Sequence, residues 1–125
     1  MAITTVTLLP YTEHGVPSGT YDGSSEDFIG IPQKAANYYR GRGSIQTIRW
    51  AFRGVQGEVL IQATLDNDPA ESRWFDVAAY GDGSSADSST ITDTYIEAVM
   101  GNFTWLRAVV TNFKDGIIES VQATY

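Results

Sequence analysis

Apolar and polar residues alternate with a period of two through most of this chain of 125 residues, and this constrains the fold more than any other feature. Between residues 43 and 53, for example, Ile48, Trp50 and Phe52 fall on one face of an extended strand, because successive side chains point to opposite faces. Glycine, asparagine, aspartate and proline bound the alternating stretches, as turn residues do. The pattern predicts short strands and no amphipathic helix of useful length.

Seven or eight strands joined by turns predict an antiparallel β-sandwich or jelly roll. Two of these strands, on either side of Gly54–Gly57, are expected to pair as a hairpin through that short connection. Residues 90–100 could instead form a short helix, although their β-branched start favours a strand. In chain order, the predicted strands are residues 3–8, 43–53, 58–66, 74–80, 90–100, 103–113 and 116–125.

The alternation also predicts which side chains form the core and which face outward. One set on the last long apolar strand, Trp105, Arg107, Val109 and Phe113, is expected to face away from the core. That set is too apolar for water alone, so we expect it to meet a second layer or a neighbouring subunit. The predicted core consists of Ile48, Trp50, Phe52, Val59, Ile61, Leu65, Phe75, Val77, Leu106, Ala108 and Val110.

Residues 1–42 lack this periodicity and contain three of the four prolines. A stretch of this length without secondary structure is unusual inside a compact domain. It is therefore either an extended N-terminal arm that makes its main contacts outside its own sheet, or an irregular edge segment that hides one or two strands. Residues 43–125 are expected to form the β-sandwich, and the length suits a single compact domain overall.

Composition excludes several classes of function. The chain has no cysteine and a single histidine, which removes disulfide scaffolds, thiolate zinc sites and sites built from two or three histidines. The net charge of −7 disfavours binding to nucleic acid or to an anionic membrane. The first ten residues lack the basic region of a secretory signal, so we expect synthesis in the cytoplasm without secretion.

Residues that could carry catalysis or hold a metal are few. His14 lies in a Gly/Pro-rich stretch and is expected to be a solvated loop residue. Asp66, Asp68 and Glu71 cluster as calcium ligands do, but their spacing does not match a 12-residue EF-hand loop, and a turn stabilised by aspartate side chains is the favoured alternative. No phosphate-binding glycine loop or nucleophile motif is present. The sequence predicts no enzyme, no catalytic residue, no cofactor and no metal.

Charge is distributed unevenly along the chain. Residues 28–57 contain no acid and carry a charge of +5, whereas residues 58–125 carry −8. This complementarity predicts a homo-oligomer or docking onto an acidic partner; the alternative is a solvated strand face whose arginines pair locally. Tyrosine, tryptophan and arginine are typical interface anchors. The candidate interface residues are Tyr38, Tyr39, Arg40, Arg42, Trp74, Trp105 and Arg107.

Three segments carry a family resemblance. Residues 57–65 read GEVLIQATL, residues 68–75 read DPAESRWF and residues 101–113 read GNFTWLRAVVTNF. Over residues 43–125 the chain resembles small β-sandwich virion proteins of tailed bacteriophages. The same outline is similar, more weakly, to jelly-roll modules of the discoidin and carbohydrate-binding kind.

The resemblance implies a non-enzymatic structural protein of the virion, as a capsid decoration or tail component. Its partners would then be other virion proteins and further copies of itself. The second resemblance implies an alternative, a β-sandwich module that binds glycans or adheres to a surface. In that case the loops around residues 67–69 and 81–83 would supply polar contacts to the glycan.

Overall fold

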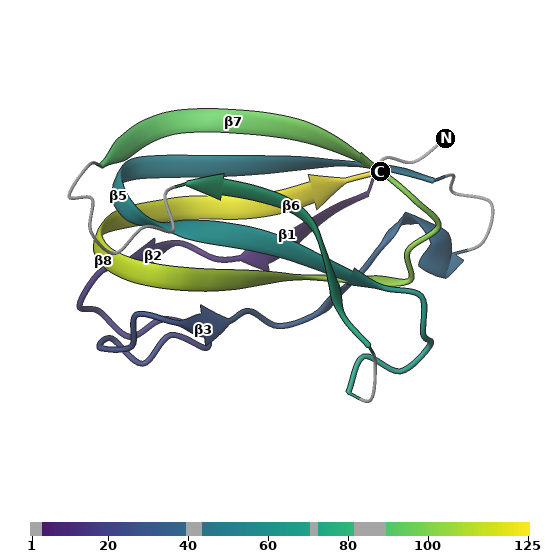
Figure 1. The fold of residues 1–125 in the computed structure, drawn as a ribbon, viewed down its shortest axis with the longest axis horizontal. Coiled ribbons are helices and arrows are strands. Elements are labelled where there is room, and N and C mark those ends of the chain that lie inside the picture. Colours follow the sequence, from purple (N-terminus) through teal and green to yellow (C-terminus); the bar gives the residue numbers. More distant parts are fainter. Residues whose placement is uncertain (1–3, 40–43, 71–72, 82–89) are drawn as a thin grey trace.

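The computed structural model describes residues 4–39, 44–70, 73–81 and 90–125, and its fold is all-β. Eight strands form one antiparallel sheet (Figure 1), which confirms the predicted all-β, antiparallel fold class. Strand β5 spans Ile45–Thr64 and β8 spans Trp105–Thr124, and both are much longer than the rest. The others are β1 (Thr5–Leu9), β2 (Thr12–Glu13), β3 (Phe28–Ile29), β4 (Gln33–Lys34), β6 (Phe75–Gly81) and β7 (Ile91–Met100), with one 3-10 helix, η1, at Ala36–Tyr39.

Strands β5 and β8 each bend sharply near the middle, so the single sheet folds over on itself (Figure 1). The bend of β5 lies at Gly54 and Gly57, whose φ angles are +63° and +149°. The bend of β8 includes Asn112 at φ +53° and Gly116 at φ +96°. These backbone conformations favour glycine and asparagine, which explains the residue types found there. A Cβ on Gly116 would overlap the carbonyl of Gly54, so the two bends cross in direct contact.

The fold-over produces two facing layers. In the first layer, the first half of β5 pairs with β7 and with the second half of β8, which in turn pairs with β1. In the second layer, the second half of β5 pairs with β6 and with the first half of β8, which pairs with β3 and β4. The arrangement is sandwich-like, but continuous strands keep both layers in one sheet.

The predicted hairpin around Gly54–Gly57 is wrong. In the part of the chain that the structure describes, the two halves of β5 do not pair with each other; each pairs with β8. A hairpin turn reverses a strand within its own layer. Here the register shifts between Arg53 and Glu58, and such bulges bend the strand into the opposite layer.

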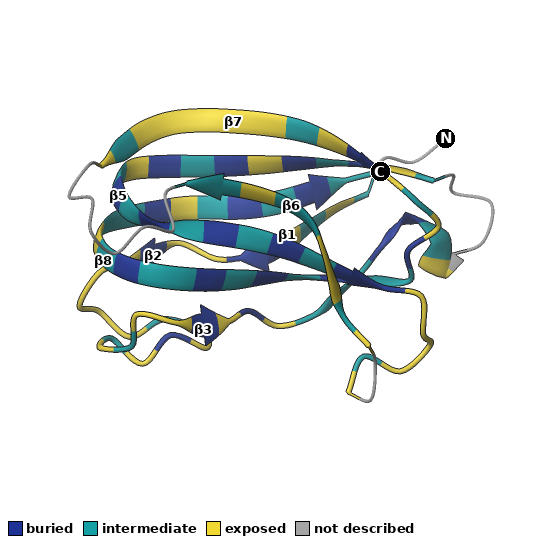
Figure 2. Cartoon of the chain, viewed as in Figure 1, coloured by how far each residue is buried: buried dark blue, intermediate teal, exposed yellow. Residues whose placement is uncertain are grey.

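The core lies between the layers, where buried residues alternate along β5 and β8 (Figure 2). The indole N–H of Trp50, in the first layer, donates to the carbonyl of Val59, in the second, at 3.2 Å. Val77 is partly buried and packs against this core. The predicted core residues confirmed as buried are Ile48, Trp50, Phe52, Val59, Ile61, Leu106, Ala108 and Val110.

Three side chains depart from their predicted positions. Leu65 is 61% exposed, because β5 ends at Thr64 and the chain leaves the sheet. Phe75 is 40% exposed, because it begins β6 at the end of the sheet, where its ring meets that of Phe103 at 5.7 Å between centroids. Phe113, predicted to face outward, is fully buried, since the positive φ of Asn112 changes the alternation at the bend.

The described part of the N-terminal segment forms edge strands. Strands β1 to β4 all pair with β8 of the same chain, from Thr5 opposite Thr124 to Lys34 opposite Trp105. Tyr21 is buried against Phe28 and Phe113, at centroid distances of 4.7 and 5.4 Å. The alternative of hidden strands therefore describes this segment, and the expectation that its main contacts lie outside its own sheet is wrong for the described residues.

Candidate interaction face

The outer side of the second layer brings several candidate residues together. Along the first half of β8, Leu106 and Ala108 point into the core, so Trp105 and Arg107 point outward and are half-buried. In the sheet, Trp105 lies between Lys34 of β4 and Thr64 of β5. The alternation along one strand thus presents an indole and a guanidinium on the same face.

The helix η1 adds a second aromatic ring beside Trp105. The rings of Tyr38 and Trp105 meet edge to face, with centroids 5.3 Å apart. The Nζ of Lys34 lies 4.6 Å from the centroid of the Tyr38 ring, a cation–π distance. The indole N–H of Trp105 donates to the carbonyl of Asn67 at 3.0 Å. Contacts from three different segments therefore hold the two rings in place.

On the same outward face, two residues along β8 from Trp105, the side chain of Arg107 is also fixed by its neighbours. Its guanidinium lies 4.3 Å from the centroid of the Trp74 ring, and its Nε donates to Oε1 of Gln62 at 2.8 Å. Gln62 in turn donates through Nε2 to Oδ1 of Asp76 at 3.0 Å. Partial burial lowers the pKa of Arg107, although an arginine remains charged at neutral pH. We call the surface formed by Tyr38, Trp74, Trp105 and Arg107 the aromatic–arginine face.

A polar cleft of about 410 Å³ opens beside this face. Its lining includes the side chain of Tyr38 together with Asn37, Asn67 and Thr104. The hydroxyl of Thr104 donates to the carbonyl of Thr64 at 3.1 Å, which helps to fix the cleft wall. The volume is in the range of small-molecule sites, which span roughly 300 to 1,000 Å³.

The structure joins four of the seven predicted interface residues, namely the members of the aromatic–arginine face. Tyr39 ends η1, and Arg40 and Arg42 lie outside the described residues. The loop at residues 67–69 was expected only to contact a glycan, and sequence reasoning did not predict that Lys34, Gln62 and Asn67 position the rings and the guanidinium. The alternation that turns Gln62 outward on its strand was a usable signal, but no local pattern predicts that Lys34 contacts Tyr38 or that Asn67 contacts Trp105.

The basic stretch from residue 28 to residue 57 pairs locally where it is described. Arg53 forms an ion pair with Glu119 on the neighbouring strand, at 3.4 Å, which raises the pKa of Arg53. The guanidinium of Arg49 donates to Oε1 of Gln122. The alternative of arginines paired along a strand face therefore describes Arg49 and Arg53.

The acidic segment after β5 behaves as a turn. Oδ1 of Asp68 accepts the N–H of Ala70 at 2.9 Å, and Oδ2 of Asp66 accepts the N–H of Arg73 at 3.0 Å. Glu71 lies outside the described residues. Across residues 4–39, 44–70, 73–81 and 90–125, no three histidine, aspartate or glutamate side chains gather closely enough to hold a metal ion. His14 is exposed, and its ring packs edge-on against Phe113.

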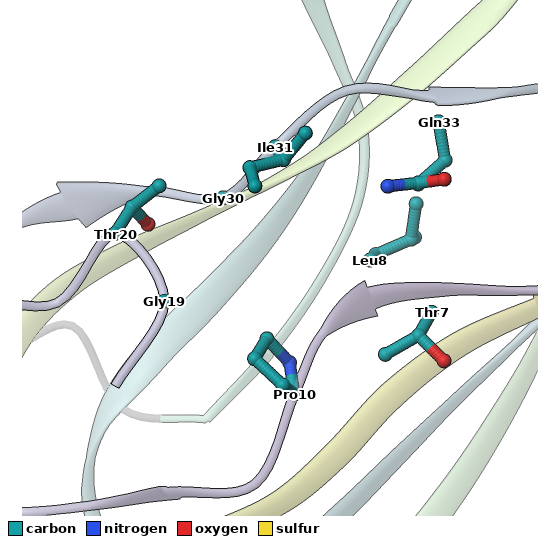
Figure 3. Close-up of a pocket in the computed structure, with 8 residues that line it drawn as sticks. All are labelled: Thr7, Leu8, Pro10, Gly19, Thr20, Gly30, Ile31 and Gln33. Carbon is teal, nitrogen blue, oxygen red and sulfur yellow. The ribbon is translucent and has the colours of Figure 1, made fainter.

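A second, more apolar pocket of about 250 Å³ lies between β1 and the chain that runs from β3 to β4 (Figure 3). Leu8 and Pro10 line one side and Gly30 and Ile31 the other. A Cβ on Gly30 would lie 2.6 Å from the carbonyl oxygen of Leu8, so the two segments approach closely there. None of the predicted interface residues lines this pocket, and it is smaller than most ligand sites.

Comparison with family models, with curated proteins and with solved structures finds no match for this chain. Within the described ranges, no helix is long and apolar enough to cross a membrane. The geometry of the aromatic–arginine face is thus the main structural guide to function.

Proposed function

We propose that this chain is a non-enzymatic structural protein of a bacteriophage virion, a capsid decoration or tail component. It is made in the host cytoplasm, resides in the virion, and acts by assembling with itself and with other virion proteins. The resemblance of residues 43–125 to small virion proteins of tailed phages suggests this class. The aromatic–arginine face supports the assembly role and is the observation that carries it.

The face has the composition and the rigidity of an interface hot spot. Tryptophan, tyrosine and arginine are the residues that most often dominate binding energy at protein interfaces. Here Trp105 is held by Asn67 and Tyr38, and Arg107 by Trp74 and Gln62, so little side-chain freedom remains to be lost on binding. A partner surface that offers a carboxylate and an apolar patch fits this arrangement.

Two measurements test the proposal. Phage particles purified from cultures that produce the chain should contain it at a fixed ratio to other virion proteins, as measured by quantitative mass spectrometry. Arg107→Ala should weaken attachment to those particles at least about tenfold, the effect of losing about 1.4 kcal/mol. Arg49→Ala, which removes an exposed arginine from the first layer, is the matched control and should leave attachment unchanged. Absence of the chain from purified particles contradicts the proposal.

The second candidate function is glycan binding, favoured by the polar cleft beside Tyr38. Aromatic rings that stack on sugars, next to amide and hydroxyl groups that bind them, are a common arrangement in small-molecule sites. The cleft offers Asn37, Asn67 and Thr104 for such hydrogen bonds. A glycan array gives specific binding if this candidate is right, and Asn37→Ala should abolish it. An array without signal for a chain found in particles favours assembly.

A further inference from the structure

Strand β7 forms an open edge of the sheet. Among the described residues it pairs only with β5, through a ladder from Ile45 opposite Met100 to Val55 opposite Ile91. Figure 1 shows it as the outermost strand of its layer, and Figure 2 shows most of it exposed. A long edge strand with free backbone groups is a ready template for pairing with another chain.

The outer side of this edge is unusually apolar. Met100 is 75% exposed, Ile96 is 60% exposed, and Ile45, the cross-strand neighbour of Met100, is 52% exposed. Ala98 lies between Ile96 and Met100 on the same side of β7 and is also exposed. Contiguous exposed apolar side chains of this kind mark interaction surfaces.

The backbone groups of the same residues point toward the open edge. The N–H of Gly101 donates to the carbonyl of Ser44 at 2.7 Å, so Gly101 directs its backbone groups toward β5. In an antiparallel ladder this direction alternates from one residue to the next. Because the ladder runs without a shift from Met100 to Asp93, the N–H and C=O groups of Thr94, Ile96, Ala98 and Met100 face away from β5. The apolar residues and the available hydrogen bonds therefore coincide.

From this coincidence we infer that β7 pairs with β7 of a second copy of the chain. The pairing is antiparallel, about a twofold axis at Ile96. The inference deepens the proposed assembly role and rests on it. Thr94 of one copy lies opposite Ala98 of the other, and the two Ile96 side chains lie opposite each other. Such a pair closes on itself, because both copies use the same surface.

Charge selects this register over its neighbours. Like charges directly opposite each other destabilise a strand pair. A twofold axis at Tyr95 would place Asp93 opposite Glu97, and an axis at Glu97 would place the two Glu97 carboxylates together. An axis at Ile96 instead places Tyr95 opposite Glu97. Within one copy the Tyr95 hydroxyl already donates to Oε1 of Glu97 at 3.5 Å, so the two side chains are compatible neighbours. Axes at Thr94 or Ala98 avoid such repulsion but leave fewer residues of β7 paired.

Site-directed cross-linking tests the register directly, because the chain contains no cysteine of its own. Residues in a hydrogen-bonded antiparallel pair have Cα atoms about 5.5 Å apart, within the range that a disulfide bridges. Ile96→Cys should therefore give a covalent dimer under mild oxidation. Ala98→Cys should not, since the two Cα atoms would be about 14 Å apart along the strands. A mixture of Thr94→Cys and Ala98→Cys chains should cross-link as a heterodimer.

A second variant and a distant control complete the test. Ile96→Lys places two ammonium groups opposite each other and should raise the dimer dissociation constant at least about tenfold in sedimentation. Ile29→Cys, on an exposed isoleucine of the second layer, should stay monomeric under oxidation. Equal cross-linking at positions 29, 96 and 98 overturns the inference, because it indicates random collision. A chain that attaches to particles without cross-linking at position 96 also overturns it, while the proposed function stands. Absence from particles overturns the proposed virion role whatever the cross-linking shows, so the two failures are distinguishable.

Discussion

The two bent strands and the N-terminal edge segment, residues 4–34, acquire their structure in different ways. Strands β5 and β8 bury alternate side chains over 20 residues each, and the buried ones face each other across the core. The strands of the edge segment are two to five residues long, and each pairs with β8. The alternation of apolar and polar residues thus determines the structure of β5 and β8, whereas pairing with β8 determines the structure of the edge segment.

Between these short strands, side-chain hydrogen bonds hold the edge segment together with a few backbone ones, such as that from the N–H of Phe113 to the carbonyl of Glu26 at 2.9 Å. The hydroxyl of Tyr21 accepts the N–H of Gly15 at 3.1 Å, and both oxygens of the Asp22 carboxylate accept hydrogen bonds from the serines that follow it. The N–H of Asn112 at the β8 bend donates to Oδ1 of Asp27 at 2.9 Å. Changes in the bent strands should therefore affect global stability, and changes in the edge segment should act locally.

The largest effect is expected from Trp50→Ala. Trp50 is fully buried and links the layers through its bond to Val59, so its loss should lower the free energy of unfolding by about 3 to 5 kcal/mol. Urea denaturation followed by circular dichroism measures this. Trp74→Ala, the same change on a half-buried outer residue, is the control. A similar loss for both variants would contradict the proposed division between core and face.

Gly116→Ala should rank second. The added methyl would overlap the carbonyl of Gly54, and the φ of +96° is strained for any side chain, so we expect a loss of about 2 to 4 kcal/mol. Gly15→Ala in the edge segment separates the two causes, because its φ is +87° but nothing lies within 4 Å of the added methyl. Thermal denaturation should show the Gly116 variant as clearly the less stable. Equal losses would mean that the crossing of the bends contributes nothing.

Tyr21→Phe should have a smaller and local effect. It removes the acceptor for the N–H of Gly15 and keeps the buried ring, so the expected loss is about 0.5 to 1.5 kcal/mol. Hydrogen exchange should accelerate at the Gly15 amide and remain unchanged along β5. Tyr11→Phe, at an exposed tyrosine, should change neither. Acceleration along β5 would show that the edge segment and the core open together.

The smallest effect concerns pH. The N–H groups of Ser24 and Ser25, and then the Ser25 hydroxyl, lower the pKa of Asp22 from its ordinary 3.8 to about 2. Because the pKa of Asp22 is lower in the folded state, the ionised carboxylate stabilises the fold. This stabilisation is complete above about pH 4 and is lost as the pH falls through 2. An NMR titration of the Asp22 carboxyl carbon should show a midpoint near 2. A midpoint near 4 would mean that these hydrogen bonds do not persist in solution.

The strands with clear alternation could be predicted from the sequence, and the reason is physical. A buried face on β5 or β8 requires a period of two over many residues, which is visible without knowledge of partners. Strands of two residues, such as β2, contain no period at all. The bend at Gly54–Gly57 was mistaken for a hairpin turn, because glycines with positive φ serve both structures. Only the distant partner strand distinguishes them.

The candidate face was predictable in part for the same reason. Trp105 and Arg107 are two residues apart on one strand, so their common face follows from alternation. The contacts of Arg107 with Trp74 and of Trp105 with Tyr38 depend on where β6 and η1 are placed. Those placements are long-range, and no local pattern specifies them.

The pairing of β1 to β4 with β8 has a consequence for synthesis on the ribosome. Among the described strands the ribosome makes β8 last, yet Val6 of β1 pairs with Ala123 of β8. The first strands must therefore remain without their sheet partner while about a hundred residues are translated. Contacts of such long range also make folding slow. The nascent chain can close its core only once β8 has left the exit tunnel, so a premature stop before β8 would leave β1 to β4 with no strand to join.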